Sequence, residues 1–370
     1  NFEQALIDLG YDDVLNDFVL TENISGVTSL DVNNKEISDL TGIEGFTALT
    51  SLNCDNNELT SLDLTSNTNL TYLYCRENQL VNLDVDNIST LDQLHCHDNQ
   101  LTSIDLTSNA ALTFLTCQNN QLTTLDLSSN TALTLLYCGN NQLTSLDVSN
   151  NTALTYLDCG INQLTSLDVS GATALTNLGC SNNSLTSLNV TSNTNLNELS
   201  CHVNSITDLD VSNNTALTNL TCYLNQITSL DVSNIPGLRF LKANSNQLST
   251  IDISNNPLLV AIGCSNNNLS SLDVSNNPLL TEIECGGDDN QQISSIDVSN
   301  NTDLYKLYCG GLGLTSLDVS ANTNLHILQC QDNSLTNIDV SNNPNLTELN
   351  IAGNQLITLD VSDHTNLVNL

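Results

Sequence analysis

The sequence predicts a mostly β fold, a solenoid whose stacked coils each contain two short parallel strands. First, a 21-residue unit such as "LTSLDVSNNTALTYLDCGINQ" (143–163) recurs in near-copies along the chain. Repetition at a fixed period of this length is typical of solenoids, whose units bury their apolar faces against one another. Second, apolar and polar residues alternate within the unit, which is the period of a β-strand. Third, a cysteine recurs every 21 residues from Cys54 to Cys222.

Each unit has two halves that share the pattern L-x-x-L-x-(C/V)-x-x-N. They are represented by "LTYLDCGINQ" and "LTSLDVSNNTA". In both halves we expect Leu and Cys or Val to point inward, and Asn to end the strand by bonding backbone groups of a turn. Strands on both sides of a coil would give a rise of about 4.8 Å per coil on each side. We therefore expect a right-handed, gently curved solenoid around a narrow aliphatic core.

The chain divides into four regions by its repeat pattern. We expect an N-terminal cap at 1–26, a 22-residue repeat at 27–48, fifteen 21-residue repeats at 49–366 and the start of a further repeat at 367–370. Apolar residues at helical spacing in "NFEQALIDLG" predict a short amphipathic helix in the cap. The repeats are interrupted near 286–292, where "GGDDNQQ" adds three residues. Because solenoids normally end in a cap, a chain ending in "LVNL" is expected to be part of a longer protein.

The repeats resemble those of a known family. The segment "LTYLYCRENQL" (70–80) fits the L-x-x-L-x-L-x-x-N-x-L signature of leucine-rich repeats, with Cys in the third Leu position. The nested ten-plus-eleven pattern is similar to the bacterial IRREKO class, and the repeat at 27–48 looks like an internalin repeat. The resemblance covers 27–370 and implies a leucine-rich repeat solenoid. Fold resemblance does not identify a ligand.

Composition excludes several classes of partner. The chain has 5 Lys+Arg against 41 Asp+Glu, a formal net charge of −36. Such a surface repels nucleic acid and anionic membrane surfaces. No run of 18 apolar residues is present, so no membrane insertion is expected. We expect an extracellular or cell-surface protein whose signal peptide lies outside this sequence, and the sequence does not indicate an oligomeric state.

All 13 cysteines fall in one inward column. Neighbouring Cα atoms in a ladder would be about 4.8 Å apart, but parallel Cβ vectors disfavour bridging. We therefore expect buried thiols that pack as small hydrophobic side chains. Without a C-x-x-C pair, a metal site in this column is not expected.

A second column contains aspartate in almost every coil, within the pattern Ser145–Asp147–Ser149. Like charges this close repel one another. Hydrogen bonds from the flanking hydroxyls or bound calcium would offset the repulsion. If repulsion dominates, the pKa values rise and acid weakens the protein less than its charge suggests, which is our expectation.

No catalytic site is expected, because the sequence lacks the spacings of metal-dependent or nucleophilic catalysis. No cofactor is expected either, although calcium is a candidate. Asp288 and Asp289 in the insertion are the candidate calcium ligands, since hard cations prefer oxygen.

The outward positions around the cysteine vary, unlike those of the aspartate column. Counted from the cysteine, these are columns −4, −3, −1 and +1, and they contain seven of the eight Tyr and four of the five Lys and Arg residues. Aromatic and Arg residues are enriched in binding hot spots. The candidate ligand-binding residues are Tyr72, Tyr74, Arg76, His95, His97, Phe114, Tyr137 and Tyr156. A second candidate patch is Arg239, Phe240, Lys242, Lys306 and Tyr308.

The sequence thus favours a non-enzymatic adhesion module that recognises a protein ligand through the variable face. Two alternatives stay open. One is a polysaccharide-binding module, because tyrosines beside Asn, Gln and Asp also suit sugars. The other is a structural spacer in a larger surface protein.

Overall fold

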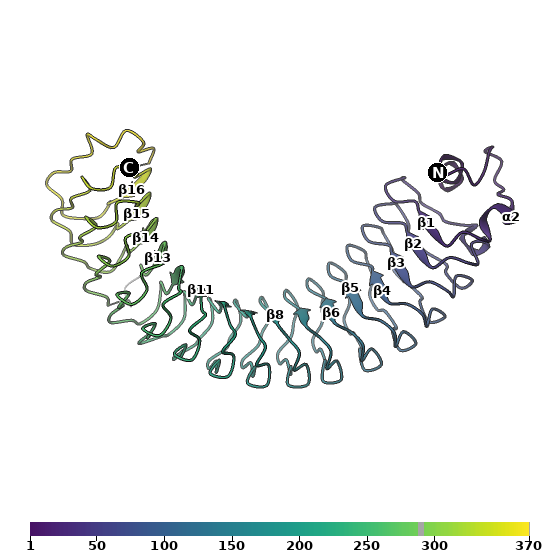
Figure 1. The fold of residues 1–370 in the computed structure, drawn as a ribbon, viewed down its shortest axis with the longest axis horizontal. Helices are drawn as coiled ribbons and strands as arrows, with labels where there is room; N and C mark the ends of the chain where they lie inside the picture. The colour runs from purple at the N-terminus through teal and green to yellow at the C-terminus, as the bar shows by residue number, and fades with distance from the viewer. Residues whose placement is uncertain (288–291, 370) are drawn as a thin grey trace. The chain divides into compact units, whose positions relative to one another are not determined.

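The computed structural model describes residues 1–287 and 292–369. It contains two compact units, and each is described by itself. Figure 1 labels helices and strands of both units along the ribbon. Unit 1 comprises Asn1–Leu175 and Asn182–Ser184, and unit 2 comprises Thr176–Ser181 and Leu185–Leu370. Both consist of coils that each contribute one three-residue strand, so the chain is a parallel-strand leucine-rich repeat solenoid with very little helix.

Unit 1 begins with short helices and continues with strands. Its elements are α1 (Phe2–Asp8), α2 (Thr21–Ile24), β1 (Ser29–Asp31), the 3₁₀ helix η1 (Ile43–Gly45), β2 (Ser51–Asn53), β3 (Tyr72–Tyr74), β4 (Gln93–His95), β5 (Phe114–Thr116), β6 (Leu135–Tyr137) and β7 (Tyr156–Asp158). The helix expected in the cap is α1, which buries Phe2, Ala5 and Leu6. The Phe2 ring lies 6.4 Å from that of Phe46, so α1 covers the apolar end of the first coils.

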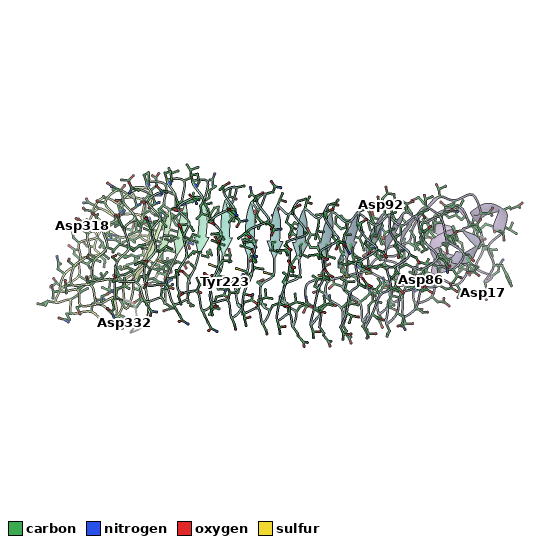
Figure 2. The ribbon with its side chains drawn as sticks, turned by 90° about the horizontal axis from the view of Figure 1, so that it is seen from below. Asp17, Asp86, Asp92, Tyr223, Asp318 and Asp332 are labelled. Carbon is green, nitrogen blue, oxygen red and sulfur yellow. The ribbon has the colours of Figure 1, made fainter. Side chains whose placement is uncertain are left out.

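Unit 2 contains the remaining strands. They are β8 (Asn177–Gly179), β9 (Glu198–Ser200), β10 (Asn219–Thr221), β11 (Phe240–Lys242), β12 (Ala261–Gly263), β13 (Glu282–Glu284), β14 (Lys306–Tyr308), β15 (Ile327–Gln329) and β16 (Glu348–Asn350). Figure 2 shows the short strands of each unit one after another, with side chains projecting on either side of them. None of the described helices has the length and apolar character needed to cross a membrane.

Consecutive strands within each unit pair in parallel and in one register. Tyr72 of β3 pairs with Gln93 of β4, a step of one 21-residue repeat. Between β13 and β14 the partners are Glu282 and Lys306, a step of 24 residues. The strand ladder therefore stays in register on both sides of the longer repeat.

The core is a stack of Leu and Cys side chains. Each strand buries its central residue, and Leu73, Leu94 and their equivalents are fully buried. All 13 cysteines are buried thiols, and burial raises the pKa of the Cys96 thiol to about 12. Because only the thiolate is reactive, these side chains behave as inert core residues.

In most of the described coils the asparagine three residues after the cysteine position fixes the turn, as the sequence predicts. Asn99 donates from Nδ2 to the carbonyl oxygens of Cys75 (2.9 Å) and Cys96 (3.2 Å). Its Oδ1 accepts from the backbone N–H of Leu80 at 2.9 Å. One buried amide thus satisfies backbone groups of two successive coils, and a side chain without both donor and acceptor would leave them unpaired.

The second strand expected in each coil is not formed as a regular ladder. Among the described residues of this half, bridge pairing occurs at Asp147 and Asp168 as an isolated contact. In this half Asp147 Oδ1 accepts the backbone N–H of Ser149 at 2.9 Å, so the carboxylate closes a local turn at the end of the segment.

Candidate functional site

The outward side of β3 to β7 in unit 1 contains the first set of candidate residues. Tyr72 and Tyr74 flank the buried Leu73, and Tyr72 is 37% exposed. His95, Tyr137 and the other strand residues of the set are partly exposed. The period-two alternation of each strand places these side chains on the face opposite the core.

The structure brings five of these side chains into one continuous ring stack. The ring centroids of Tyr74 and His95 are 4.7 Å apart, and those of His95 and Phe114 are 4.8 Å apart. The stack continues from Phe114 to Tyr137 at 6.2 Å and from Tyr137 to Tyr156 at 4.6 Å. These separations lie in the range of favourable aromatic pairs. We call these five residues the ring stack. Tyr72 lies on the same face outside it.

His95 is the polar member of the ring stack. Desolvation, with smaller contributions from the neighbouring His97 and Arg76, lowers its pKa to about 4. Its Nδ1 lies 3.3 Å from the hydroxyl of Thr116, a partner that the sequence analysis did not identify. His95 is therefore a neutral ring at physiological pH, which suits a stack between Tyr74 and Phe114.

Arg76 is paired with a carboxylate of its own chain. Its Nε lies 2.7 Å from Asp55 Oδ2, and its backbone N–H donates to Asp55 Oδ1 at 2.9 Å. The Asp55 side chain is only 6% exposed. Burial raises the Asp55 pKa, and the hydrogen bonds and charge of Arg76 partly oppose that rise. Arg76 is thus less available to an anionic ligand than its sequence position suggests. Asp55 occupies column +1 one repeat earlier, and this adjacency is the signal that identifies the pair.

His97 also has an acidic partner beside it. Its Nδ1 lies 2.6 Å from Oδ2 of Asp98. Asp98 Oδ1 accepts from Asn119 Nδ2, and Asn119 Oδ1 accepts from Asn140 Nδ2, both at 2.8 Å. A polar ladder therefore borders the ring stack at the end of the strands. Its amides and carboxylate give the face hydrogen-bonding groups next to its rings.

The second candidate patch in unit 2 is divided by acidic residues. Phe240 of β11 is 38% exposed, and Arg239 and Lys242 beside it are exposed. Lys306 and Tyr308 lie on β14, three strands away, and Lys306 Nζ is 3.6 Å from Oε2 of Glu282. The intervening β13 places carboxylates between the two groups, so the structure does not join the patch into one basic surface.

The pKa values of the aspartate column contradict our expectation that repulsion raises them and that acid weakens the protein less than its charge suggests. The backbone N–H and hydroxyl of Ser128 lower the pKa of Asp126 more than the charges of Asp105 and Asp147 raise it. The same direction holds for the other aspartates of the column whose pKa shifts are resolved, such as Asp147 and Asp168. Hydrogen bonds, and not repulsion, dominate because each carboxylate is bonded locally and screened by water.

The candidate calcium ligands Asp288 and Asp289 lie outside the described residues. Among the residues that the structure describes, no group of three or more His, Cys, Asp or Glu side chains is arranged to hold a metal ion. The calcium site therefore stays a prediction.

Comparison with known proteins identifies the repeats. The family described as leucine rich repeats (2 copies) matches residues 131–171. A comparison with curated proteins finds no match. Among solved structures, the functional domain of InlJ from Listeria monocytogenes, which includes a cysteine ladder, is 40% identical to this chain. The match covers 90% of this chain and 69% of that one, with a TM-score of 0.75.

Two more distant structures share the fold alone. The internalin InlF from Listeria monocytogenes is 21% identical over 100% of this chain and 93% of its own, with a TM-score of 0.60. The ectodomain of the receptor kinase GASSHO1/SCHENGEN3 from Arabidopsis thaliana, in complex with CASPARIAN STRIP INTEGRITY FACTOR 2, is also 21% identical. It covers 93% of this chain and 52% of its own, with a TM-score of 0.74.

The InlJ domain is 40% identical to this chain and, like it, includes a ladder of cysteines. The leucine-rich repeats, the buried cysteine ladder and the single strand per coil occur together along this chain. The assignment to the 21-residue IRREKO class stays a prediction. The chain belongs to the internalin-like leucine-rich repeat proteins.

Proposed function

We propose that this chain is an extracellular adhesion module that recognises a protein ligand through the ring stack of unit 1. The single observation that carries the proposal is the row of five stacked side chains on the exposed strand face. Because stacked rings are held by one another, they lose little conformational entropy when a ligand covers them. Rigid aromatic anchors of this kind dominate protein interfaces.

Charge restricts the kind of partner. Arg76 is neutralised by Asp55, and the chain as a whole has a net charge of −36. A ligand surface with basic residues around an apolar centre would complement this face and would be attracted to it over a distance. Some solved leucine-rich repeat structures contain a bound partner. The Arabidopsis receptor ectodomain, for example, is in complex with CASPARIAN STRIP INTEGRITY FACTOR 2. A non-enzymatic role is consistent with this design, because the ring stack contains no charged nucleophile or acid–base pair.

The test compares two matched variants on an array of extracellular matrix and mucosal proteins. Tyr74→Ala with Tyr137→Ala removes two rings of the stack, whereas Asp105→Asn with Asp126→Asn changes the uniform face of nearby coils. Loss of a hot spot commonly costs about 2 kcal/mol or more, roughly thirtyfold in affinity. We expect that loss in the tyrosine variant alone. Equal losses in both variants, or a loss in the aspartate variant alone, would contradict the assignment of the face.

A further inference from the structure

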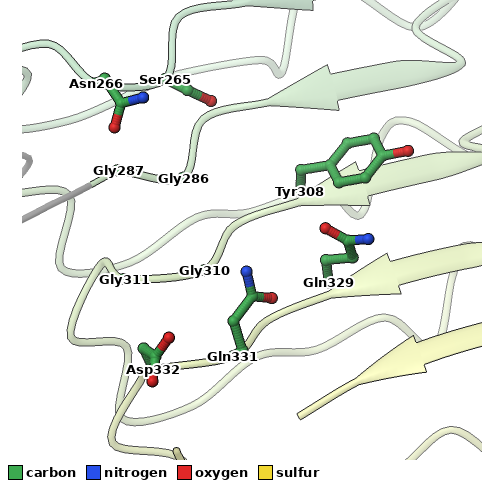
Figure 3. Close-up of a pocket in the computed structure, with 10 residues that line it drawn as sticks. All are labelled: Ser265, Asn266, Gly286, Gly287, Tyr308, Gly310, Gly311, Gln329, Gln331 and Asp332. Carbon is green, nitrogen blue, oxygen red and sulfur yellow. The ribbon is translucent and has the colours of Figure 1, made fainter. Parts of the chain in front are cut away.

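A hollow in unit 2 lies where the chain has the smallest side chains. It has a volume of about 670 Å³ and is formed by four successive coils, just after β12 to β15 (Figure 3). In the two central coils, columns +1 and +2 are both glycine: Gly286–Gly287 and Gly310–Gly311. In most other coils these columns contain larger side chains, such as Arg76 and Glu77. The hollow therefore exists because these four positions are glycines, which have no side chain to fill it.

The glycines also allow the coils to approach closely. A Cβ atom on Gly286 would lie 2.8 Å from the carbonyl oxygen of Gly310. Gly311 has a φ of +73°, and a Cβ there would collide with the Gly287 carbonyl. Both positions are thus restricted to glycine, so the floor of the pocket is peptide backbone.

The pocket wall presents one ring and several neutral polar groups. Tyr308 and Gln329 lie at the ends of adjacent strands, and the amide of Gln331 extends over Gly310 (Figure 3). The Oε1 atom of Gln331 is buried and has no hydrogen-bond partner among the described residues. An acceptor without a partner is unfavourable, and a ligand hydroxyl donating to the Gln331 amide would supply one.

The charges around the pocket narrow the ligand class. Asp332 is the one formally charged residue among those lining it, and no lining residue is basic. An anionic ligand would therefore be repelled. Asp332 is exposed to water, where a single carboxylate holds a cation weakly. An apolar ligand would leave the amides and glycine backbone without partners.

We propose that this pocket binds a neutral sugar, with a sugar ring lying on the face of Tyr308 and its hydroxyls bonded to the amide of Gln331 and to Oε1 of Gln329, whose Nε2 donates to Oε1 of Glu348. The volume falls in the range of about 300–1,000 Å³ found for small-ligand sites, which accommodates a short oligosaccharide. Carbon-bound hydrogens of a sugar suit an aromatic face, while its hydroxyls donate and accept as amides require. This site is separate from the ring stack and does not depend on the proposed protein ligand.

The experiment titrates the whole chain with defined saccharides and follows binding by ligand-observed NMR and calorimetry. The neutral probes are lactose, maltose, cellobiose, chitobiose and mannobiose, and sialyllactose is the anionic counterpart of lactose. We expect at least one neutral probe to bind. Tyr308→Ala is expected to weaken that binding at least about tenfold, and Gln331→Ala several-fold. The matched control is Tyr223→Ala, which removes another partly exposed tyrosine of unit 2 that does not line the pocket.

The proposal is overturned by the absence of binding by every neutral probe at tens of millimolar, by a stronger response to sialyllactose than to lactose, or by an equal loss in Tyr223→Ala and Tyr308→Ala. Circular dichroism of each variant establishes that it is folded, because Tyr308 is partly exposed and its truncation should leave the core intact. Binding retained in Tyr308→Ala but lost in Gln331→Ala would also contradict the placement of the sugar on the ring.

Discussion

The two halves of each coil share nearly the same sequence pattern, yet their backbone groups find hydrogen-bond partners in different ways. In the strand half, backbone groups pair with the next coil, and a buried Asn such as Asn99 closes the turn. In the aspartate half, Asp147 bonds the N–H of Ser149 within its own turn. The strand half therefore has a rigid ladder on which outward residues can vary. The aspartate half has a uniform face because its outward carboxylate is part of the backbone's own hydrogen bonding.

The largest effect that we expect concerns how fast a thiol reagent reaches the buried cysteines of the strand half. Cysteines 0% exposed, such as Cys117 and Cys138, can react only when the ladder opens. Burial also raises their pKa values, which disfavours the reactive thiolate. Labelling of native protein by a thiol reagent should be at least about a thousandfold slower than labelling of unfolded protein. Rapid labelling of central cysteines, measured by mass spectrometry of peptides, would mean that the ladder is not closed.

The second prediction compares the two kinds of turn. Asn99→Ala removes the donor for Cys75 and Cys96 and the acceptor for the N–H of Leu80, all of them buried. Unpaired buried groups cost about 1–3 kcal/mol each, so we expect a loss of about 3 kcal/mol or more. Denaturant unfolding measures it.

The control for that variant is Asp105→Ala, which removes the acceptor for the backbone N–H of Thr107 in an exposed turn. Water can replace that hydrogen bond, so the loss should be clearly smaller. If the two variants lose equal stability, the distinction between a buried ladder turn and a solvated turn is wrong.

The sequence was sufficient to predict the features that recur in every repeat. It was insufficient to predict those that depend on contacts between neighbouring coils. Cys54 and Cys75, one repeat apart, already define the inward column, and the fold follows from stacking it. The missing second strand was not foreseen, because Leu146 and Val148 alternate with polar residues just as the residues of the strand half do. Alternation predicts an extended segment with one buried side, and it does not show whether neighbouring coils pair there.

The candidate site shows the same division. Variation in the columns beside the cysteine indicates which face is distinctive. Variation does not show that the rings of Phe114 and Tyr156, which lie in column −3, stack on the ring of Tyr137, which lies in column −1. This contact depends on side-chain rotamers. The sugar pocket was overlooked because it consists of absent side chains. The two Gly-Gly pairs were visible in the sequence, but their adjacency matters only once the coils are stacked.

The third prediction concerns how the melting temperature changes when acid protonates the carboxylates of the aspartate half. Its carboxylates have lowered pKa values in the folded state, because backbone N–H groups and hydroxyls bond the charged form. Such groups stabilise the fold above their unfolded pKa of about 4 and lose that contribution as pH falls through the folded values. The melting temperature in chelator should therefore fall progressively below about pH 4. In a variant with Asp105→Asn, Asp126→Asn and Asp147→Asn the fall should be shallower. A melting temperature that rises in acid would restore the repulsion interpretation.

The smallest expected effect belongs to one residue of the strand half. His95 has a folded pKa of about 4, below the ordinary value of about 6.5, because its ring is desolvated within the ring stack. Between these values the unfolded chain takes up a proton that the folded chain does not, so stability should decrease as pH falls from about 6.5 to 4. This interval lies above that of the aspartates, which allows the two halves to be titrated separately. His95→Gln should flatten the slope in this interval and leave the decline below pH 4 intact. NMR of the His95 ring should show it neutral at pH 5.5. A protonated ring at that pH would show that the stack is open to water, and the rigidity attributed to the strand half would not hold at the ring stack.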